Sequence, residues 1–285
     1  MRSPSLADVD SLELSELLET ELTLDVELHE DTRIHPTAIV DPRAELDVGV
    51  EVGPYTVIGP NVRVGAHTRI GPHVLIERDT IIGAHCRIAK GAVLGTDPQD
   101  LKYRGEPTNL VVGDRTTIRE FATLNRGTAA RGTTSVGSNC LLMAYVHVAH
   151  DCAIGDHVIL ANAVNMGGHV IIDDWAAIGG MTAIHQFVRI GTHAFVGGAS
   201  RVAKDVPPYV RAAGSPLELY GLNTVGLQRR GFPDDVRREL HRAYRLFFAS
   251  SYNISQAMER ARQELRPLPE IQIFLDFIAR SERGV

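Results

Sequence analysis

The chain has 285 residues, of which 44% are hydrophobic and 22% charged, and its formal net charge is −6. This length and apolar content predict a folded protein with a sizeable core and exclude a disordered chain. No apolar run is long enough to cross a bilayer, and the first residues lack the basic and apolar parts of a signal peptide. We therefore expect a cytoplasmic protein without an integral membrane segment.

The first 30 residues form an acidic extension, since residues 1–31 carry ten Asp or Glu against one Arg. This segment is rich in Leu, and a short helix and a mobile tail are both open interpretations. At the other end, the chain from Pro207 onward carries twelve Arg against nine acidic residues. A basic C-terminal third favours an acidic partner or a phosphorylated ligand, although a solvated helical surface explains the same excess.

Residues 31–206 carry a six-residue repeat. Of the 29 positions met by stepping in sixes from Ile34 to Val202, 26 are Ile, Leu, Val or Met. Four residues after these aliphatics the chain places small or β-branched residues, so both rows point to one face of a short strand. Gly often follows the aliphatic, where the chain must turn. Short strands and turns at this spacing predict a hexapeptide β-helix.

This repeat resembles the left-handed parallel β-helix of the hexapeptide acyltransferases, in which three hexads make one triangular coil. The resemblance implies a mainly-β fold of roughly ten coils. The handedness comes from the resemblance alone, because crossover connections generally favour the opposite hand. Two polar breaks in the repeat, at about 95–111 and 126–135, predict loops that project from one face, often the binding face.

The six-residue period ends after Pro207-Pro208, and helical patterning follows. It predicts a small α-helical C-terminal domain over 207–285, with helices at 233–250, 254–265 and 268–281. Asn253 and Gln256 suit a capping box at the start of the second helix.

The repeat also predicts which cysteines and histidines are structural. The three cysteines occupy the small inward position, so we expect free, packed thiols at Cys86, Cys140 and Cys152. Five histidines stand at outward turn positions and need no functional explanation: His67, His73, His85, His157 and His193.

Four other histidines are predicted to cluster along one edge. At eighteen residues per coil they fall on the same edge in three successive coils: His147, His150, His169 and His185. Such a cluster suits a proton-transfer site, because histidine titrates near neutral pH.

A metal site is the alternative for this cluster, as in the hexapeptide carbonic anhydrases, which resemble this fold. The chain lacks the His-x4-His spacing of that family, and Asp151 beside His150 suits an orienting carboxylate. We therefore predict no metal and no other cofactor.

A more specific resemblance rests on five segments in order. They are PQDLKYRGEPT at 98–108, LLMAYVHVAHDC at 141–152, IGGMTAIHQF at 178–187, DVPPYV at 205–210 and GLQRRGF at 226–232. They resemble the UDP-N-acetylglucosamine O-acyltransferase family, which begins lipid A synthesis, and the similarity runs from about Ile34 to the C-terminus. It implies transfer of a (3-hydroxy)acyl chain from acyl carrier protein to the 3-hydroxyl of UDP-N-acetylglucosamine. It also implies a homotrimer with sites between neighbouring β-helices, and no nucleic-acid partner.

The same resemblance implies a role for individual residues. His150 matches the general base, with Asp151 beside it, and the backbone N–H of Gly168 matches the donor that stabilises the tetrahedral oxyanion. The residues that match substrate-binding positions are Asp100, Lys102, His147, His169, His185 and Gln186. Asn223 and Arg229 match contacts to the nucleotide end, and Gly198 matches the position that closes the acyl groove.

Two positions depart from the family pattern and leave the acceptor open. Asn125 stands in LNRGT where the family often has His, and Val225 stands where some members have Glu. A 3-amino sugar is therefore an alternative acceptor, and the acyl chain length is not fixed. The alternative functions are the later N-acyltransferase of the pathway and a non-catalytic β-helix. The N-acyltransferase has a uridine-binding domain before its β-helix, for which the 33 residues before Ile34 are too few.

Overall fold

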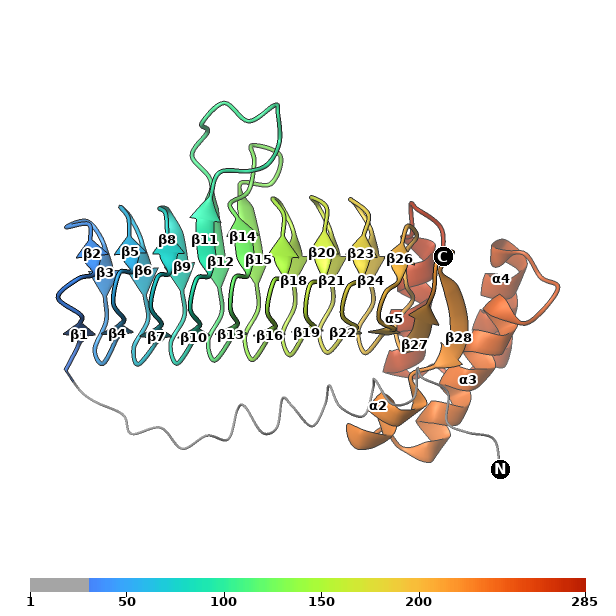
Figure 1. Cartoon of the computed structure of the whole chain (residues 1–285). Helices are drawn as coiled ribbons and strands as arrows, with labels where there is room; N and C mark the ends of the chain where they lie inside the picture. Colours follow the sequence, from blue (N-terminus) through green and yellow to red (C-terminus); the bar gives the residue numbers. More distant parts are fainter. Residues whose placement is uncertain (1–30) are drawn as a thin grey trace.

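A computed structural model describes residues 31–285 as a three-sided stack of coils that leads into a group of helices (Figure 1). The helix or tail considered for residues 1–27 lies outside the described residues. Within them, no helix is both long and apolar enough to cross a membrane.

Three sheets form the sides of the stack, and their strands are parallel except for β28 at the end of sheet A. Sheet A orders β1 (Arg33–Ile34), β4 (Glu51–Val52), β7 (Arg69–Ile70), β10 (Arg87–Ile88), β13 (Thr117–Ile118), β16 (Leu141–Leu142), β19 (Ile159–Leu160), β22 (Ala177–Ile178), β25 (Phe195–Val196), β27 (Val210–Ala213) and β28 (Glu218–Leu222). Sheet B orders β2 (Ile39–Val40), β5 (Val57–Ile58), β8 (Leu75–Ile76), β11 (Val93–Thr96), β14 (Thr123–Asn125), β17 (His147–Val148), β20 (Asn165–Met166), β23 (Ala183–Ile184) and β26 (Arg201–Val202). Sheet C orders β3 (Glu45–Leu46), β6 (Arg63–Val64), β9 (Thr80–Ile82), β12 (Asn109–Val112), β15 (Thr133–Val136), β18 (Ala153–Ile154), β21 (Ile171–Ile172) and β24 (Arg189–Ile190).

The predicted hexad register holds along the stack. Ile34 pairs with Val52, and Val52 pairs with Ile70, so successive coils are offset by one eighteen-residue turn. The aliphatic of each hexad points inward, and from Val52 onward these side chains make one continuous core. The cysteines are confirmed as buried, free thiols in this core. Because each two-residue strand is too short to be stable alone, the coils depend on stacking.

Three edges join the sheets, and we name each edge by the two sheets that it connects. The two breaks in the repeat are both insertions on the B–C edge, where they project together from the stack (Figure 1). They are shorter than predicted, because β11 and β12 extend into the first break and β15 into the second. The first loop is residues 97–108 and the second loop is residues 126–132. β12 and β15 remain paired along these extensions, since Asn109 pairs with Thr133 and Leu110 pairs with Thr134.

The C-terminal region begins with a hairpin that the helical patterning did not predict. β27 adds to sheet A beside β25, and β28 returns antiparallel to it. The hairpin was missed because it follows the last hexad and its strands have only four and five residues.

Four helices follow the hairpin: α2 (Thr224–Arg229), α3 (Asp234–Phe248), α4 (Ile254–Glu264) and α5 (Pro269–Ala279). The last three lie where helices were expected, and the capping box between Asn253 and Gln256 is present. α2, a helix of six residues, was not predicted. These helices pack around a second apolar core that includes Leu240, Phe247 and Phe274.

Candidate active site

The B–C edge gathers most of the residues that the sequence singled out. His147 lies on β17, His150 and Asp151 lie in the turn after it, and Gly168 and His169 occupy the same turn one coil further. Both inserted loops leave sheet B at this edge. One side of the β-helix therefore carries imidazoles, a carboxylate and two projecting loops.

His150 is paired with the carboxylate beside it. Its Nδ1 lies 2.8 Å from Asp151 Oδ2, and its side chain is 13% exposed. A carboxylate at Nδ1 favours the tautomer with a proton on that nitrogen, which leaves Nε2 as a proton acceptor. The pair therefore has the geometry of a general base with an orienting carboxylate.

Asp151 is fully buried and takes its other hydrogen bonds from the second loop. The backbone N–H of Thr128 donates to Oδ1 at 2.9 Å, and the Thr128 hydroxyl donates to Oδ2 at 2.7 Å. Burial raises the pKa of this carboxyl, but the bonds from Thr128 and His150 outweigh burial and leave the pKa below its ordinary value. Asp151 therefore stays ionised beside His150 at neutral pH.

Gly168 lies directly against the His150 ring. A Cβ at this position would stand 2.5 Å from Cε1 and 2.7 Å from Nε2 of His150, so any side chain would displace the ring. Within residues 31–285 the Gly168 N–H donates to no protein acceptor. A free backbone donor beside the basic nitrogen can stabilise an oxyanion that forms there.

Two more imidazoles line the same edge. Nδ1 of His147 lies 2.7 Å from the Thr123 hydroxyl, and burial lowers the pKa of His147, with a further lowering by His150. His169 meets the His150 ring edge-on, with centroids 5.2 Å apart, and stacks on Phe187. Burial lowers the pKa of His169 although Asp151 opposes this effect. Both rings are therefore neutral hydrogen-bonding groups near pH 7.

The remaining residues predicted for this edge are more loosely placed. Asp100 and Lys102 lie on the first loop, where the Lys102 N–H donates to Asp100 Oδ1 at 2.9 Å. The carboxylate of Asp100 raises the pKa of His169, but this effect is smaller than the lowering by burial. His185 and Gln186 are exposed in the turn after β23, where His185 Nδ1 lies 3.0 Å from the Gln186 carbonyl oxygen.

Three predicted residues lie on other edges of the chain. Gly198 follows β25 on the A–B edge, where a Cβ would meet the Gly180 carbonyl oxygen at 3.2 Å. Asn223 caps α2 and donates to the carbonyl of His193, in the turn on the C–A edge, and Arg229 ends that helix. A single chain therefore does not bring these residues together with His150.

Three donors on the B–C edge also have the spacing of a possible metal site. One ligand atom from each of His150, Asp151 and His169 lies within 4.8 Å of the others. However, both Asp151 oxygens already accept hydrogen bonds, from Thr128 and His150. A metal would have to displace these donors, so the chemistry of this set fits proton transfer better.

Sequence reasoning missed the residues that support the site. Thr128 holds Asp151 from the second loop, Arg131 reaches the Asp151 carbonyl oxygen at 3.4 Å, and Thr123 positions His147. The break in the repeat was the only signal that pointed to Thr128 and Arg131. It predicted a loop but not what the loop contacts.

Comparisons with known proteins agree with this arrangement. The family model described as UDP-N-acetylglucosamine O-acyltransferase, domain 2, matches residues 205–285. The bacterial transferase hexapeptide model matches residues 49–78, 61–96 and 133–168.

Curated relatives and solved structures match most of the chain. An acyl-[acyl-carrier-protein]–UDP-N-acetylglucosamine O-acyltransferase of Pseudomonas entomophila is 46% identical over 83% of this chain and 92% of its own length. The protein of the same name from Myxococcus xanthus is 49% identical over 70% of this chain and 78% of its own.

The structure of LpxA, a UDP-N-acetylglucosamine acyltransferase from Bacteroides fragilis, matches with a TM-score of 0.87 and 42% identity, covering 88% of this chain and 99% of that one. The predicted left-handed parallel β-helix is thereby confirmed. On these matches, the chain belongs to the UDP-N-acetylglucosamine O-acyltransferase family.

Proposed function

We propose that this chain transfers an acyl group from acyl carrier protein to the 3-hydroxyl of UDP-N-acetylglucosamine, the first step of lipid A synthesis. The observation that carries the proposal is the group formed by His150, Asp151 and Gly168. It offers a base nitrogen held by a buried carboxylate, 2.8 Å away, beside an unpartnered backbone N–H. Family membership supports the identity of both substrates.

The reaction follows from this geometry. Nε2 of His150 takes the proton from the sugar 3-hydroxyl while that oxygen attacks the thioester carbonyl carbon. The carbonyl oxygen becomes an oxyanion, which accepts a hydrogen bond from the Gly168 N–H. When the tetrahedral intermediate collapses, the C–S bond breaks and the imidazolium returns its proton to the leaving thiolate. The products are the 3-O-acyl sugar nucleotide and the free carrier thiol.

Asp151 contributes by holding the imidazole and by stabilising the imidazolium that forms. Its charge is kept by Thr128, so the carboxylate remains ionised when His150 gains a proton. His147 and His169 stay neutral beside it and serve as hydrogen-bonding groups for the acceptor sugar, together with Asp100 and Lys102.

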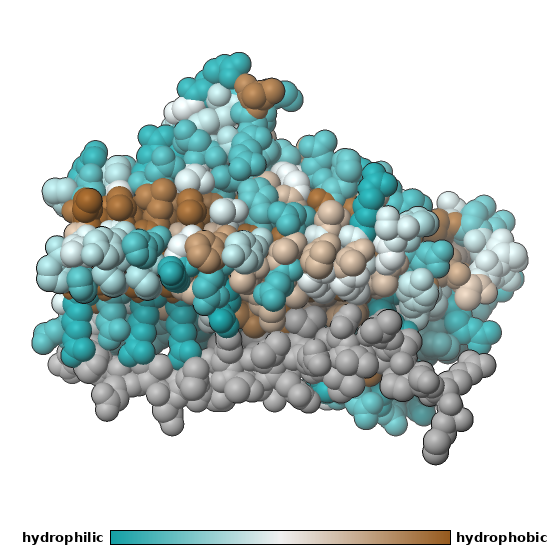
Figure 2. Space-filling model, in the orientation of Figure 1, coloured by the Kyte–Doolittle hydropathy of each residue, from teal (hydrophilic) through white to brown (hydrophobic). Residues whose placement is uncertain are grey.

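We propose that the complete site forms between chains of a homotrimer. Gly198 lies on the A–B edge, and Asn223 and Arg229 lie toward the C–A edge, whereas His150 lies on the B–C edge. Residues on three different edges of one β-helix can form one site only if an edge of one chain lies against an edge of a neighbouring chain. Exposed apolar residues support this packing, since Ile39 is 66% and Val57 37% exposed on sheet B, where Figure 2 shows a hydrophobic band.

The proposed docking surface for the acidic carrier protein is a groove between α2 and α3. Its lining combines apolar and basic side chains: Leu222, Thr224, Leu227, Asp234, Arg237, Arg238, His241 and Arg242. Arg242 pairs at 3.0 Å with the buried Glu239, so its removal would disturb the helix itself. Arg238 is exposed and is the cleaner probe.

We expect Arg238→Glu to weaken carrier binding about 3–10-fold at low salt, with the effect fading as salt rises. Arg262→Glu, an exposed arginine outside the groove on α4, is the matched control. Equal carrier affinity for the two variants at low salt would exclude this surface.

The proposed function is tested with purified protein, an acyl carrier thioester and UDP-N-acetylglucosamine. We expect acylated sugar nucleotide and free carrier thiol in equal amounts, with the acyl group on the 3-oxygen by NMR. The 3-amino analogue, offered in competition, tests the alternative acceptor. No product from either acceptor would support the non-catalytic alternative and contradict the proposal.

A further inference from the structure

Arg126 is the largest side chain that the described part of the chain buries completely. It follows β14 and opens the second loop. A buried guanidinium is stable only where acceptors surround it, because it loses its water. The position of these acceptors therefore shows what the residue holds in place.

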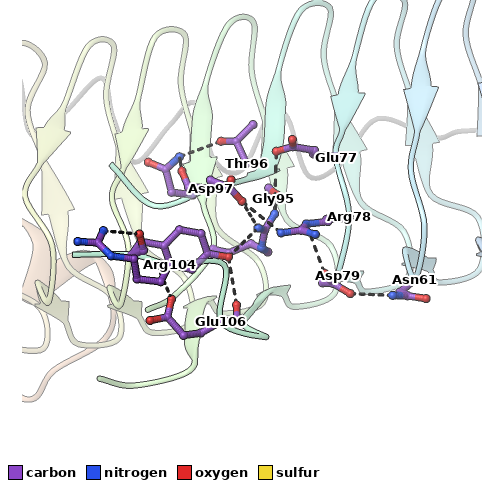
Figure 3. Close-up of polar contacts among 12 residues, drawn as sticks. Asn61, Glu77, Arg78, Asp79, Gly95, Thr96, Asp97, Arg104 and Glu106 are labelled. Carbon is purple, nitrogen blue, oxygen red and sulfur yellow. Dashed lines mark hydrogen bonds and ion pairs between the residues drawn. The ribbon is translucent and has the colours of Figure 1, made fainter. Parts of the chain in front are cut away.

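Its acceptors lie on the strand ends and the loop next to it on the B–C edge, where Figure 3 labels Gly95, Thr96 and Asp97. The guanidinium also lies 3.9 Å from the carboxylate of Glu77, after β8 on the same edge. One terminal nitrogen donates to the carbonyl of Gly95, and the other donates to the Asp97 carboxylate and, at 3.2 Å, to the Tyr103 hydroxyl. The backbone N–H of Arg126 donates to the Thr96 carbonyl at 3.0 Å. Arg126 therefore holds the first loop at its base, from Gly95 to Asp97, and at one point within the loop, Tyr103.

That point lies beside the residues proposed to bind substrate. The Tyr103 N–H donates to the Asp100 carbonyl at 3.0 Å, and the Tyr103 hydroxyl donates to the Glu106 carbonyl at 3.1 Å. Lys102 is the neighbouring residue. Leu101, between Asp100 and Lys102, is 96% exposed. The placement of this turn therefore depends on Tyr103 and on the group that Tyr103 meets.

On its other side, Arg126 leads directly into the support of the catalytic pair. Gly127 donates to the Asn109 carbonyl at 3.2 Å, and a Cβ there would stand 2.4 Å from the backbone nitrogen of Thr133. Thr128 then holds Asp151 with two hydrogen bonds. The backbone from Arg126 to Thr128 is therefore confined, and a shift at one end is transmitted to the other.

We propose that Arg126 is a positioning residue that fixes the substrate-binding first loop relative to the His150–Asp151 pair. It touches no reacting atom and acts through Tyr103 on one side and Thr128 on the other. The proposal rests on the proposed function for its kinetic readout, but the coupling of the two loops is a property of the fold. The two are therefore tested by separate measurements.

The test compares Arg126→Gln, Arg126→Lys and Tyr103→Phe with the unchanged protein. Arg126→Gln should raise KM for UDP-N-acetylglucosamine and lower kcat, each about 10-fold or more, since small displacements of bound groups are costly. Tyr103→Phe removes the contact on the first loop only, so KM should rise about 3-fold at unchanged kcat. Arg115→Gln, an exposed arginine on the C–A edge, is the matched control.

Hydrogen–deuterium exchange supplies a readout that does not need activity. Arg126→Gln should speed exchange in both 98–107 and 128–134, whereas Tyr103→Phe should affect 98–107 alone. Arg126→Lys keeps the buried charge but not the planar fork. We expect it to recover the melting temperature without recovering KM, whereas a merely structural cation would be rescued in both.

Several results would overturn the proposal. Unchanged exchange in residues 128–134 of folded Arg126→Gln would show that the two loops are not coupled through this side chain. Full recovery of KM and kcat in Arg126→Lys would show that only the buried charge at this position matters, which would overturn the proposal. If Arg126→Gln does not fold, unchanged KM and exchange in Tyr103→Phe would contradict the proposal. If the unchanged protein shows no acyl transfer, the proposed function fails while the exchange measurement still decides the coupling.

Discussion

The B–C and C–A edges of the β-helix carry the same kind of turn but use it differently. On the B–C edge, Asp151 and His169 occupy the turn position with positive φ, at 60° and 63°. On the C–A edge, His157 and His193 occupy the equivalent position, at 57° and 56°. The backbone geometry is the same, so the difference between the edges lies in what each side chain meets.

On the C–A edge the rings stack on one another. His157 lies 3.7 Å from Trp175, and Trp175 lies 6.0 Å from His193, measured between ring centroids. The Arg230 guanidinium covers Trp175 at 3.8 Å, so this column ties the end of α2 to the coils. Burial, with a contribution from Arg230, lowers the pKa of His193 to about 4. Nδ1 of His193 is buried without a hydrogen-bond partner in the described chain.

On the B–C edge Asp151 occupies this turn position, and rings of the described chain stack only in the next two coils, where His169 lies on Phe187. Asp151 holds Nδ1 of His150 at 2.8 Å and is itself held by the second loop. A histidine on this fold is therefore a packing group by default, and a buried carboxylate at its Nδ1 makes it a base. The sequence analysis gave the outward turn histidines no functional role, and on the C–A edge His157 and His193 both stack on Trp175.

The largest expected effect separates the two edges by activity. His150→Ala should lower kcat about 10²–10⁴-fold, because it removes the base from an intact site. His193→Phe, on the C–A edge, keeps the stacked ring and should leave kcat near the unchanged value. Steady-state rates of both purified variants check this. Comparable losses in both would show that the edges do not differ in the way described.

A second prediction concerns the A–B edge, where Gly198 precedes the turn residue Ala199. Each buried methylene is worth about 0.8 kcal/mol, so a side chain at Gly198 that blocks three should shift chain-length preference by about 2.4 kcal/mol, or some fifty-fold. Gly198→Met is assayed against a ladder of acyl carrier thioesters. Ala199→Met is the matched control, because Met181 occupies that turn position one coil earlier. A uniform loss across the ladder would leave Gly198 as a turn residue only.

A third prediction weakens the carboxylate support without removing it. Thr128→Val deletes one hydrogen bond to Asp151 and should lower kcat about 10-fold, since the imidazole is then less well oriented. Thr116→Val, which changes another buried threonine in a turn on the C–A edge, is the control. Unchanged kcat in Thr128→Val would mean that the second loop does not support the base.

Thr128→Val should also change how the free energy of unfolding depends on pH in acid solution. The pKa of Asp151 lies below its ordinary value of 3.8, so its contribution is present above that pH and is lost as pH falls through the folded-state pKa. Without the Thr128 hydroxyl the folded-state pKa rises. Denaturant unfolding followed between pH 5 and 3 should therefore show the loss beginning at higher pH in Thr128→Val.

The last prediction is a stability difference on the C–A edge. Because the pKa of His193 falls from 6.5 to about 4 on folding, the unfolded chain binds a proton in this window that the folded chain does not. The free energy of unfolding should fall by about 2 kcal/mol between pH 6.5 and 4, and His193→Phe should remove that part of the slope. Parallel slopes for the two proteins would contradict the assignment.

The contrast between the edges also explains what the sequence could predict. The hexad repeat predicted the strands, the core and the inward cysteines, because stacking imposes one period on every coil. Adjacency along the chain and between coils predicted that Asp151 and His169 would lie beside His150, whereas Gly168 was expected there only from the family resemblance. Both kinds of inference depend on a fixed period.

Where the period breaks, prediction from the sequence stopped. Thr128 lies 23 residues from Asp151 and reaches it from an inserted loop whose path no repeat dictates. Arg126 was missed for the same reason. Its acceptors on the first loop are Asp97 and Tyr103, and that loop is also an insertion. The hairpin of β27 and β28 follows the last hexad, where the pattern carried no information about strands.

The role of His150 as the base depends on which of its two ring nitrogens carries the proton. Nitrogen-15 NMR of histidine-labelled protein at neutral pH distinguishes the two tautomers, with His150→Ala assigning the signal. We expect a proton on Nδ1, held by Asp151, and an unprotonated Nε2 that is free to accept the substrate proton. A proton on Nε2 at neutral pH, with Nδ1 unprotonated, would contradict the base assigned to this site.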